Sequence, residues 1–361
     1  MARVRHDEGP TERSPSDPLG GAAGSEDRED DAPGIRPQML AEYIGQTALK
    51  RKLGVFVQAA RERGEALDHT LLHGPPGLGK TTMAHILANE MGVQCHVTSG
   101  PAVEHKGVLA GHLTALGEGD VLFIDEIHRL TPTVEESLYS AMEDGRIDLP
   151  VGEGARARTM PFALAPFTLI GATTRTALLS APLRERFQIV EGIEFYSDKE
   201  LAMIVSRTSS LLGMPATDGG AQEIGHRSRG TPRIANRLTR RVRDFAQVQA
   251  CTEIDAETAA AALRELGIDN EGLDSLDRRI LVAIVDAFAG GPVGIEAIAA
   301  TLSEPRDTLE DVYEPFLLQR GFLVRTPRGR QVTRRALAHL GRTPKGKPAG
   351  PGGAGQGELD L

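Results

Sequence analysis

Apolar residues in the middle of the chain follow two alternating patterns. Four short apolar runs have the length of buried strands, and each gives way to small or polar residues at its end; they cover residues 70–73, 94–99, 121–124 and 167–174. Between these runs, apolar residues recur at helical spacing. Buried strands that alternate with helices predict an α/β fold with a parallel sheet. Ligands bind such sheets beyond the carboxyl ends of the strands.

The helical pattern continues without strand signals over residues 198 to about 267. There Ile234, Leu238, Val242 and Phe245 share one face of a helix. This predicts a small all-helical domain.

The last part of the chain has a third pattern. Helical stripes over residues 276–288, 295–302 and 307–318 precede two short β runs, at residues 322–325 and 331–333. Three helices followed by a hairpin are typical of a winged helix.

Length and composition restrict the class of protein. A chain of 361 residues exceeds the usual size of one hydrophobic core, so we expect two or three domains with tails. No apolar run approaches the roughly 18 residues that span a bilayer, and the N-terminus lacks the pattern of a secretory signal. Two cysteines, Cys95 and Cys251, are too few for a disulfide framework or a zinc site. We therefore expect a cytoplasmic protein with no membrane partner.

The net charge of −9 is unevenly distributed along the chain. Residues 1–34 contain nine acids and four arginines, a net charge of −5, and their composition predicts a disordered tail. Residues 321–347 contain eight Arg or Lys and no acid, although a Gly-rich tail follows from residue 346. An anionic partner is expected for this basic segment.

A phosphate-binding motif follows the first predicted strand. Residues 74–81 read GPPGLGKT and fit the pattern G-x-x-x-x-G-K-[ST] between a strand and a helix. Glycines let backbone N–H groups surround the phosphates, Lys80 reaches the β- and γ-phosphates, and Thr81 offers a hydroxyl to Mg²⁺. The motif predicts that the chain binds ATP with Mg²⁺.

Two acids end the third predicted strand, in the sequence VLFIDE at residues 121–126. Asp125 can hold the Mg²⁺ shell and Glu126 can polarise the attacking water. Because phosphoryl transfer depends mostly on positioning and charge neutralisation, these groups predict an ATP hydrolase.

Three further segments resemble the nucleotide pocket of AAA+ ATPases. FTLIGATT at residues 167–174 resembles sensor 1, for which we choose Thr174 over Thr173. PLRERF at residues 182–187 places Arg186 at the position of the arginine finger, which reaches the nucleotide of a neighbouring subunit. GTPRIANR at residues 230–237 places Arg233 at sensor 2.

Whole phrases then resemble the RuvB family of Holliday-junction branch-migration ATPases. They are HGPPGLGKTT, VLFIDEIHRL, AMEDGRID, FTLIGATTR, PLRERF, GTPRIANRL, GGPVG and GFLVRTPRGR, and the resemblance extends over residues 35–340. It implies a large AAA+ ATPase domain at 35–196, a helical lid at 197–267 and a winged-helix DNA-binding domain at 270–345. Disordered tails are expected at 1–34 and 346–361.

The resemblance also implies a set of site residues. For the nucleotide they are Ile35, Arg36, Gly77, Gly79, Lys80, Thr81, Thr82, Glu143, Asp144, Gly145, Arg186, Tyr196 and Arg233. For DNA they are Arg306, Arg325 and Arg330, and the absence of aromatic side chains around these arginines favours phosphate contact over base reading.

The function implied is that of a homohexamer that encircles double-stranded DNA. With RuvA, such a motor drives Holliday-junction branch migration in recombination, DNA repair and the SOS response, and RuvC is an expected further partner. A hairpin at residues 147–159, with Leu149 and Val151 as apolar contacts, would bind RuvA.

Two other functions compete with this one. A clamp loader or initiator would use the same pocket as an ATP-controlled switch, but the Ser-Arg-Cys finger of clamp loaders is absent from the sequence. A winged-helix regulator with an inactive ATPase fold is disfavoured by the intact Lys80, Asp125 and Glu126.

Overall fold

A computed structural model describes residues 34–151 and 158–342, and the chain divides into two units, the first ending at Asp274 and the second beginning at Ser275. The predicted tails, apart from Gly34, lie outside the described residues. None of the described helices combines the length and the apolar character that crossing a bilayer requires.

A parallel five-stranded sheet forms the centre of the first unit, in the order β2-β3-β6-β1-β7. Its strands are β1 (Thr70–His73), β2 (Cys95–Ser99), β3 (Val121–Asp125), β6 (Thr168–Thr173) and β7 (Ile189–Gly192). This confirms the predicted parallel α/β sheet. Strand β7 was not predicted, because it lies at an edge of the sheet, where only Ile189 is buried, and its residues Ile-Val-Glu-Gly do not form a continuous apolar run.

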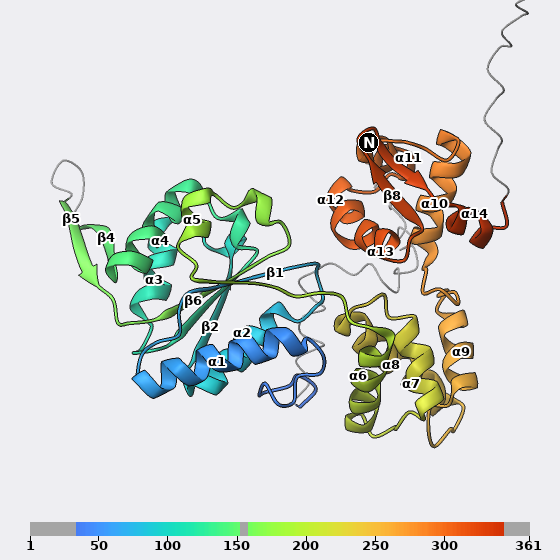
Figure 1. Ribbon diagram of the computed structural model, residues 1–361, viewed down its shortest axis with the longest axis horizontal. Coiled ribbons are helices and arrows are strands. Elements are labelled where there is room, and N and C mark those ends of the chain that lie inside the picture. Colours follow the sequence, from blue (N-terminus) through green and yellow to red (C-terminus); the bar gives the residue numbers. More distant parts are fainter. Residues whose placement is uncertain (1–33, 152–157, 343–361) are drawn as a thin grey trace, which may run out of the picture. The chain divides into compact units, whose positions relative to one another are not determined.

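Helices cover both faces of this sheet. Figure 1 shows α1 and α2 on one side and α3 and α4 on the other. Their bounds are α1 (Thr47–Arg63), α2 (Lys80–Met91), α3 (Lys106–Thr114) and α4 (Pro132–Asp144), with a short α5 (Ala181–Glu185) and the 3₁₀ turns η1 (Gly100–Ala102), η2 (Ile127–Arg129) and η4 (Thr176–Leu178).

Successive strand residues supply two separate hydrophobic cores. In β3, Phe123 packs in the core that includes residues of α1 and α2, while Leu122 and Ile124 pack in the core that includes residues of α3 and α4. Side chains alternate between the faces of a strand, so a sheet covered on both sides needs apolar residues at every position. The continuous apolar run that predicted the strand therefore results from burial on both faces.

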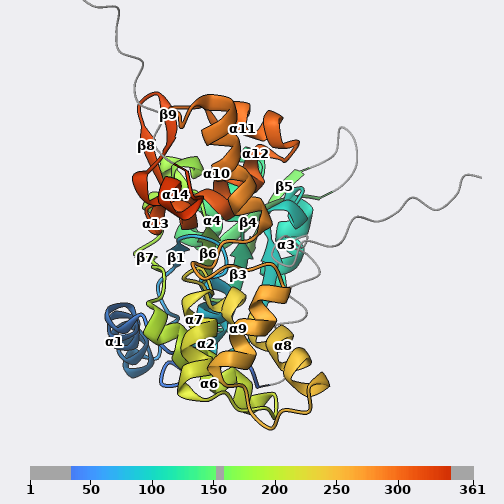
Figure 2. The ribbon, with the colours of Figure 1, turned by 90° about the vertical axis from the view of Figure 1, so that its right-hand side faces the viewer.

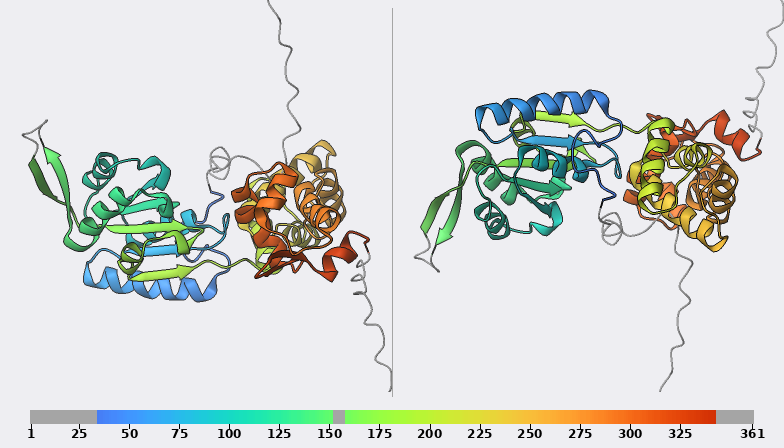
Figure 3. Two further views of the ribbon diagram at one scale, coloured as in Figure 1. Left: turned by 90° about the horizontal axis from the view of Figure 1, so that it is seen from above. Right: turned by 90° about the horizontal axis from the view of Figure 1, so that it is seen from below.

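A two-stranded antiparallel hairpin extends from the large domain, as predicted. It consists of β4 (Arg146–Val151) and β5 (Arg158–Ala163), and in both views of Figure 3 it extends away from the main sheet. Ile147 is buried and Leu149 is half-buried, but their cross-strand partners Phe162 and Met160 are 40% and 49% exposed. The exposed apolar residues of the described hairpin thus lie on β5, which the sequence did not indicate. The side chain of Val151 lies outside the described part.

Four helices form the lid, which confirms the all-helical prediction: α6 (Asp198–Leu211), α7 (Asp218–His226), α8 (Pro232–Val248) and α9 (Ala256–Glu265). Helix α6 begins with a capping box between Ser197 and Glu200, and the side chains of Thr217 and Asp255 cap α7 and α9. Helix α8 has Pro232 at its start, where the missing N–H has no cost.

The second unit has the predicted winged-helix layout. It contains α10 (Ser275–Phe288), α11 (Ile295–Leu302), α12 (Arg306–Thr308), η5 (Leu309–Tyr313), α13 (Glu314–Gln319), β8 (Leu323–Thr326), β9 (Gly329–Val332) and α14 (Arg334–His339). Figure 2 shows β8 and β9 side by side as the antiparallel wing. The third predicted helix is not regular, because η5 is a π-helical turn that precedes Pro315, which cannot donate a backbone hydrogen bond.

The buried strand β3 offers a test of the core. Phe123 is fully buried in β3, and its register partner Val97 on β2 is half-exposed. We expect Phe123→Ala to lower the free energy of unfolding of the first unit by about 3–5 kcal/mol, because it removes buried area and leaves a cavity. A urea titration followed by circular dichroism measures the change. Val97→Ala is the matched control, expected to stay within about 0.5 kcal/mol of the wild type; equal effects of the two substitutions would contradict the assigned packing.

Candidate functional site

The segment between β1 and α2 is a phosphate-binding loop with a tightly enclosed backbone. Gly74, Gly77 and Gly79 all have positive φ, at 142°, 77° and 97°. A Cβ on Gly74 would lie 2.4 Å from the carbonyl oxygen of Ile193, so the loop excludes side chains at this point. The loop leads directly into α2, whose first N–H groups and dipole favour an anion.

Lys80 is buried at the start of α2. Its Nζ donates hydrogen bonds to the carbonyl oxygens of Gly74 at 2.8 Å and Pro75 at 2.9 Å. Burial lowers the pKa of Lys80 to about 8, even though the nearby Asp125 carboxylate favours the charged form. The ammonium is therefore held by weakly compensating carbonyl groups, and phosphate oxygens would be stronger partners.

The two predicted acids lie at the carboxyl end of β3. Asp125 Oδ1 accepts a hydrogen bond from the backbone N–H of Glu126 at 2.8 Å, and the Glu126 carboxylate accepts one from Arg129 at 3.0 Å. Glu126 has a φ of 48°, which is unusual for a residue with a side chain and turns the chain sharply after the strand. Both acids line the same cavity as Lys80.

The structure separates the two threonines at the end of β6. Thr173 is buried, and its hydroxyl lies 3.0 Å from Nδ1 of His128 and accepts a hydrogen bond from the backbone of Arg175. Thr174 lines the cavity. Thr174 is therefore the better placed of the two to face a bound nucleotide.

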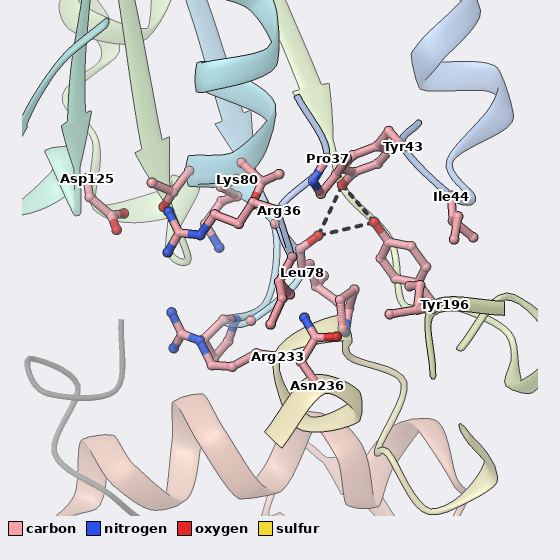
Figure 4. A pocket seen from close by; sticks show the side chains of 18 of the residues that line it. Arg36, Pro37, Tyr43, Ile44, Leu78, Lys80, Asp125, Tyr196, Arg233 and Asn236 are labelled. Atoms are coloured by element: carbon pink, nitrogen blue, oxygen red, sulfur yellow. Dashed lines mark hydrogen bonds between the residues drawn. The ribbon is translucent and has the colours of Figure 1, made fainter. Parts of the chain in front are cut away.

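Arg233 reaches the cavity from the lid. Its backbone N–H donates to the carbonyl oxygen of Gly77 at 3.3 Å, and a Cβ on Gly77 would lie 3.2 Å from the Cβ of Arg233. The first turn of α8 thus contacts the phosphate-binding loop directly. Figure 4 shows Lys80, Asp125 and Arg233 at one end of the pocket.

Two tyrosines close the other end of the pocket, as Figure 4 shows. Tyr196 donates a hydrogen bond to the hydroxyl of Tyr43 at 2.7 Å, and Tyr43 donates to the carbonyl oxygen of Leu78 at 3.3 Å. Burial raises the pKa of Tyr43 to about 12 and raises that of Tyr196 further, so both stay protonated and can donate. Tyr43 was missed by the sequence analysis, since no motif surrounds it.

A lid arginine holds the segment that precedes Tyr43. Arg207 of α6 donates hydrogen bonds to the carbonyl oxygens of Gly34 and Ile35. Ile35 and Arg36 line the cavity, so Arg207 ties the lid to the N-terminal side of the pocket. It too was absent from the predicted set.

Together these elements enclose a cavity of about 590 Å³. It brings together twelve of the predicted residues: Ile35, Arg36, Gly77, Gly79, Lys80, Thr81, Thr82, Asp125, Glu126, Thr174, Tyr196 and Arg233.

Four predicted residues are not among the described residues that line the cavity: Glu143, Asp144, Gly145 and Arg186. Two of them contact each other elsewhere. Arg186 Nη2 pairs with the Glu143 carboxylate at 3.0 Å, and the guanidinium lies 4.4 Å from the centre of the Tyr139 ring. The sequence analysis assigned a role at a neighbour's nucleotide to Arg186 alone, whereas the Glu143–Gly145 turn was predicted only as a nucleotide contact.

The predicted DNA-contacting arginines form ion pairs with acids of the winged helix. Arg325 and Arg330 pair with Glu314, and Arg306 pairs with Glu310. Residues 321–347 contain no acid, but Glu310 and Glu314, which precede this segment in the chain, neutralise part of its positive charge in the fold. Arg328 and Arg334 are exposed.

Comparison with known proteins identifies the family. Residues 35–193 match the "Holliday junction DNA helicase RuvB P-loop domain", residues 196–269 the "RuvB AAA lid domain" and residues 270–341 the "RuvB C-terminal winged helix domain". A curated relative, the Holliday junction branch migration complex subunit RuvB of Myxococcus xanthus (strain DK1622), is 58% identical over 316 residues, which cover 88% of this chain and 92% of the relative. The chain belongs to the RuvB family.

Solved RuvB structures have the same fold as this RuvB-family chain. The Thermotoga maritima RuvB Holliday junction branch migration motor matches it with a TM-score of 0.79 at 51% identity, over 86% of this chain and 99% of that one. A mutant form of the T. maritima protein matches with a TM-score of 0.80 at 52% identity, over 85% and 98%. Membership of the RuvB family makes the chain a nucleotide-binding AAA+ ATPase, as the sequence predicted.

The lowered pKa of Lys80 predicts how ATP affinity depends on pH. In the free protein the amine loses its proton as the pH rises through about 8, whereas bound phosphates favour the charged form. Binding above this pH must therefore take up a proton, and affinity should fall by up to about tenfold per pH unit. Isothermal titration calorimetry between pH 7.5 and 9.5 measures this slope. The control Lys80→Arg keeps its charge throughout, so its affinity should not follow the slope; the same slope in both proteins would assign it to another group.

Proposed function

We propose that this chain is an ATP-driven motor that encircles double-stranded DNA and, together with RuvA, drives the branch migration of Holliday junctions. The observation that supports this most is the single cavity in which the phosphate-binding loop, the two acids of β3, Thr174 and the lid residue Arg233 meet. The family match over all three domains and the name of the M. xanthus relative support the substrate.

The hydrolytic roles follow from the chemistry of the side chains. Lys80 neutralises charge on the β- and γ-phosphates, Glu126 polarises the attacking water, and Thr174 orients the water and the γ-phosphate. Arg233 contacts the γ-phosphate from the lid, so cleavage would release the lid from the phosphate-binding loop. Cleavage of the γ-phosphate would thereby cause the lid domain to move.

Mg²⁺ fits the oxygens available in this pocket. Thr81 supplies a hydroxyl and Asp125 a carboxylate, and both line the cavity beside Lys80. Mg²⁺ prefers such hard oxygen ligands together with phosphate oxygens and water, and it would neutralise negative charge that develops on the phosphates. Thr81 and Asp125 are the residues proposed to hold it.

Arg186 and the Glu143–Gly145 turn lie away from the cavity of their own chain, which supports an active site shared between copies in a homohexameric ring. In such a ring, Arg186 would meet the charge that develops on the neighbour's γ-phosphate. A trans arginine of this kind contributes about 10³ to 10⁵ in rate.

The hairpin of β4 and β5 is the proposed RuvA-binding element. Met160 and Phe162 expose apolar surface on β5, beside Leu149 on β4. Exposed apolar side chains on a projecting hairpin favour a protein partner. We assign the contact to Met160 and Phe162 in addition to Leu149.

Loading or opening another ring, as clamp loaders and initiators do, is the alternative use of the same pocket. A four-way-junction migration assay with purified RuvA separates the two functions. We expect ATP-dependent migration, and loss of both migration and hydrolysis with Lys80→Ala. ATP hydrolysis without junction migration would favour the loader.

Mixing two inactive variants tests the shared active site. Lys80→Ala removes the phosphate-binding amine and Arg186→Ala removes the finger, so each variant alone should hydrolyse ATP at least about 10³-fold more slowly than the wild type. In a mixture, boundaries with an intact Lys80 on one side and an intact Arg186 on the other should restore part of the turnover. A mixture that remains as inactive as its components would contradict the shared site.

Salt dependence tests the DNA contacts. We expect Arg330→Ala, and separately Arg325→Ala, to weaken duplex binding equally for all sequences and to lower the slope of log affinity against log salt by about 0.9 per lost phosphate contact. Filter binding at several salt concentrations measures the slope. An unchanged slope in both variants would remove the wing from the DNA interface.

A further inference from the structure

One buried carboxylate holds both wing arginines. Glu314, at the first position of α13, is 3% exposed and lies against β8 and β9, where Arg325 and Arg330 are register partners. Arg325 is 55% exposed and Arg330 is 14% exposed. Glu314 precedes Arg325 by 11 positions and Arg330 by 16, so only the fold brings it to the hairpin that carries both arginines.

The geometry is the same for the two guanidinium groups. Arg325 donates from Nε to Oε1 of Glu314 at 2.9 Å and from Nη2 to Oε2 at 2.8 Å. Arg330 donates from Nε to Oε1 at 2.8 Å and from Nη2 to Oε2 at 2.9 Å. Each carboxylate oxygen thus accepts from both arginines, which fixes the two guanidinium planes in relation to each other.

Electrostatics keep this carboxylate charged. Burial alone would raise the pKa of Glu314, but the hydrogen bonds and positive charges of Arg325 and Arg330 outweigh burial and hold the pKa below its usual value. Glu310, one turn earlier, adds a weaker contact to Arg330 at 3.3 Å. Glu314 is therefore ionised at neutral pH.

These bonds use the Nε–Nη2 edge of each arginine, and the contact to Glu310 also comes from Nη2 of Arg330, so the Nη1 group of each arginine is left. A guanidinium has five N–H donors in a rigid fork, so the Nη1 group still offers two donors after the Nε–Nη2 edge is occupied. A phosphate oxygen can accept from Nη1 while Glu314 keeps the side chain in place. Ordering the long side chains in advance also lowers the entropy lost on binding.

We propose that Glu314 is a positioning residue for DNA binding, which aligns Arg325 and Arg330 so that both contact backbone phosphates of the same duplex. This inference rests on the proposed function, because it assumes that the wing contacts DNA. It assigns to an acid, whose charge repels DNA, a favourable contribution to the affinity.

The sign of the effect makes the proposal testable. Charge alone predicts that Glu314→Gln strengthens DNA binding, since it adds a unit of positive charge beside the wing. Positioning predicts the opposite. We expect Glu314→Gln to weaken duplex binding about threefold to tenfold and to lower the log–log salt slope by about 0.9 to 1.8, corresponding to one or two phosphate contacts.

Three variants of the full chain complete the experiment. Asp286→Asn makes the same charge change at an exposed position of α10, and its affinity should not fall. Glu314→Asp keeps the charge but is one methylene shorter, so it should lose slope although the charge is intact. In the Arg325→Ala/Arg330→Ala background, Glu314→Gln should cause no further loss, because its effect acts through these arginines.

The outcomes distinguish the two proposals. A Glu314→Gln protein that binds DNA more tightly, or with an unchanged slope, overturns the positioning role while Arg325→Ala and Arg330→Ala still report on the wing. If those two alanine variants keep the wild-type slope, the wing is not the DNA interface and both proposals fail. A further loss of slope in the double-alanine background would show that Glu314 acts on the fold and would overturn the positioning role. Thermal melts of each variant, followed by circular dichroism, measure the stability of the fold in parallel.

Discussion

The close approach of the lid to the phosphate-binding loop is the contact on which the ATPase unit depends. Gly77 has no side chain and adopts a positive φ, so the first turn of α8 can lie against the loop and the Arg233 N–H can reach the Gly77 carbonyl. A Cβ at this point would lie 3.2 Å from the Cβ of Arg233, closer than side chains normally pack. This backbone contact brings Arg233 of the helical lid into the cavity that lies at the carboxyl ends of the parallel strands.

Both units hold a charged group out of water and fix it with a small number of hydrogen bonds. The Lys80 ammonium is held by two backbone carbonyls, and the Glu314 carboxylate by two guanidinium groups. Burial of a charge is unfavourable unless partners compensate. For Lys80 the partners compensate burial only in part, so the pKa of the ammonium falls and a phosphate would be a strong additional partner. For Glu314 the two arginines more than compensate burial, so the charged carboxylate is favoured and its pKa also falls. A lowered pKa thus has opposite causes in the two cases: an incompletely compensated ammonium at Lys80 and a fully hydrogen-bonded carboxylate at Glu314.

The residues absent from the cavity are as informative as those inside it. Arg186 is held by Glu143 and by the face of Tyr139, on a part of the large domain formed by α4 and α5. A side chain fixed in this way is ordered before it meets a partner, which limits the entropy lost when it does. The proposed ring would therefore bring together two prepared surfaces, the cavity of one copy and the Arg186 surface of the next.

The sequence by itself determined the elements whose signals are local. The strands β1, β3 and β6 were predictable because both of their faces are buried, and the phosphate-binding loop because its glycines and Lys80 must be contiguous. Strand β2 lies at an edge and is only partly buried, but its short run of strand-forming residues was sufficient to predict it. Resemblance to a family added Arg186, Tyr196 and Arg233, whose positions no local pattern identifies. Only the tertiary structure decided the rest: β7 lies at an edge and has no apolar run, Tyr43 reaches Leu78 across 35 positions, and Glu314 meets arginines from a later hairpin. The physical reason is that local periodicity records which side of an element is buried, whereas the partner of a polar or charged side chain is chosen by the packing of elements far apart in the chain.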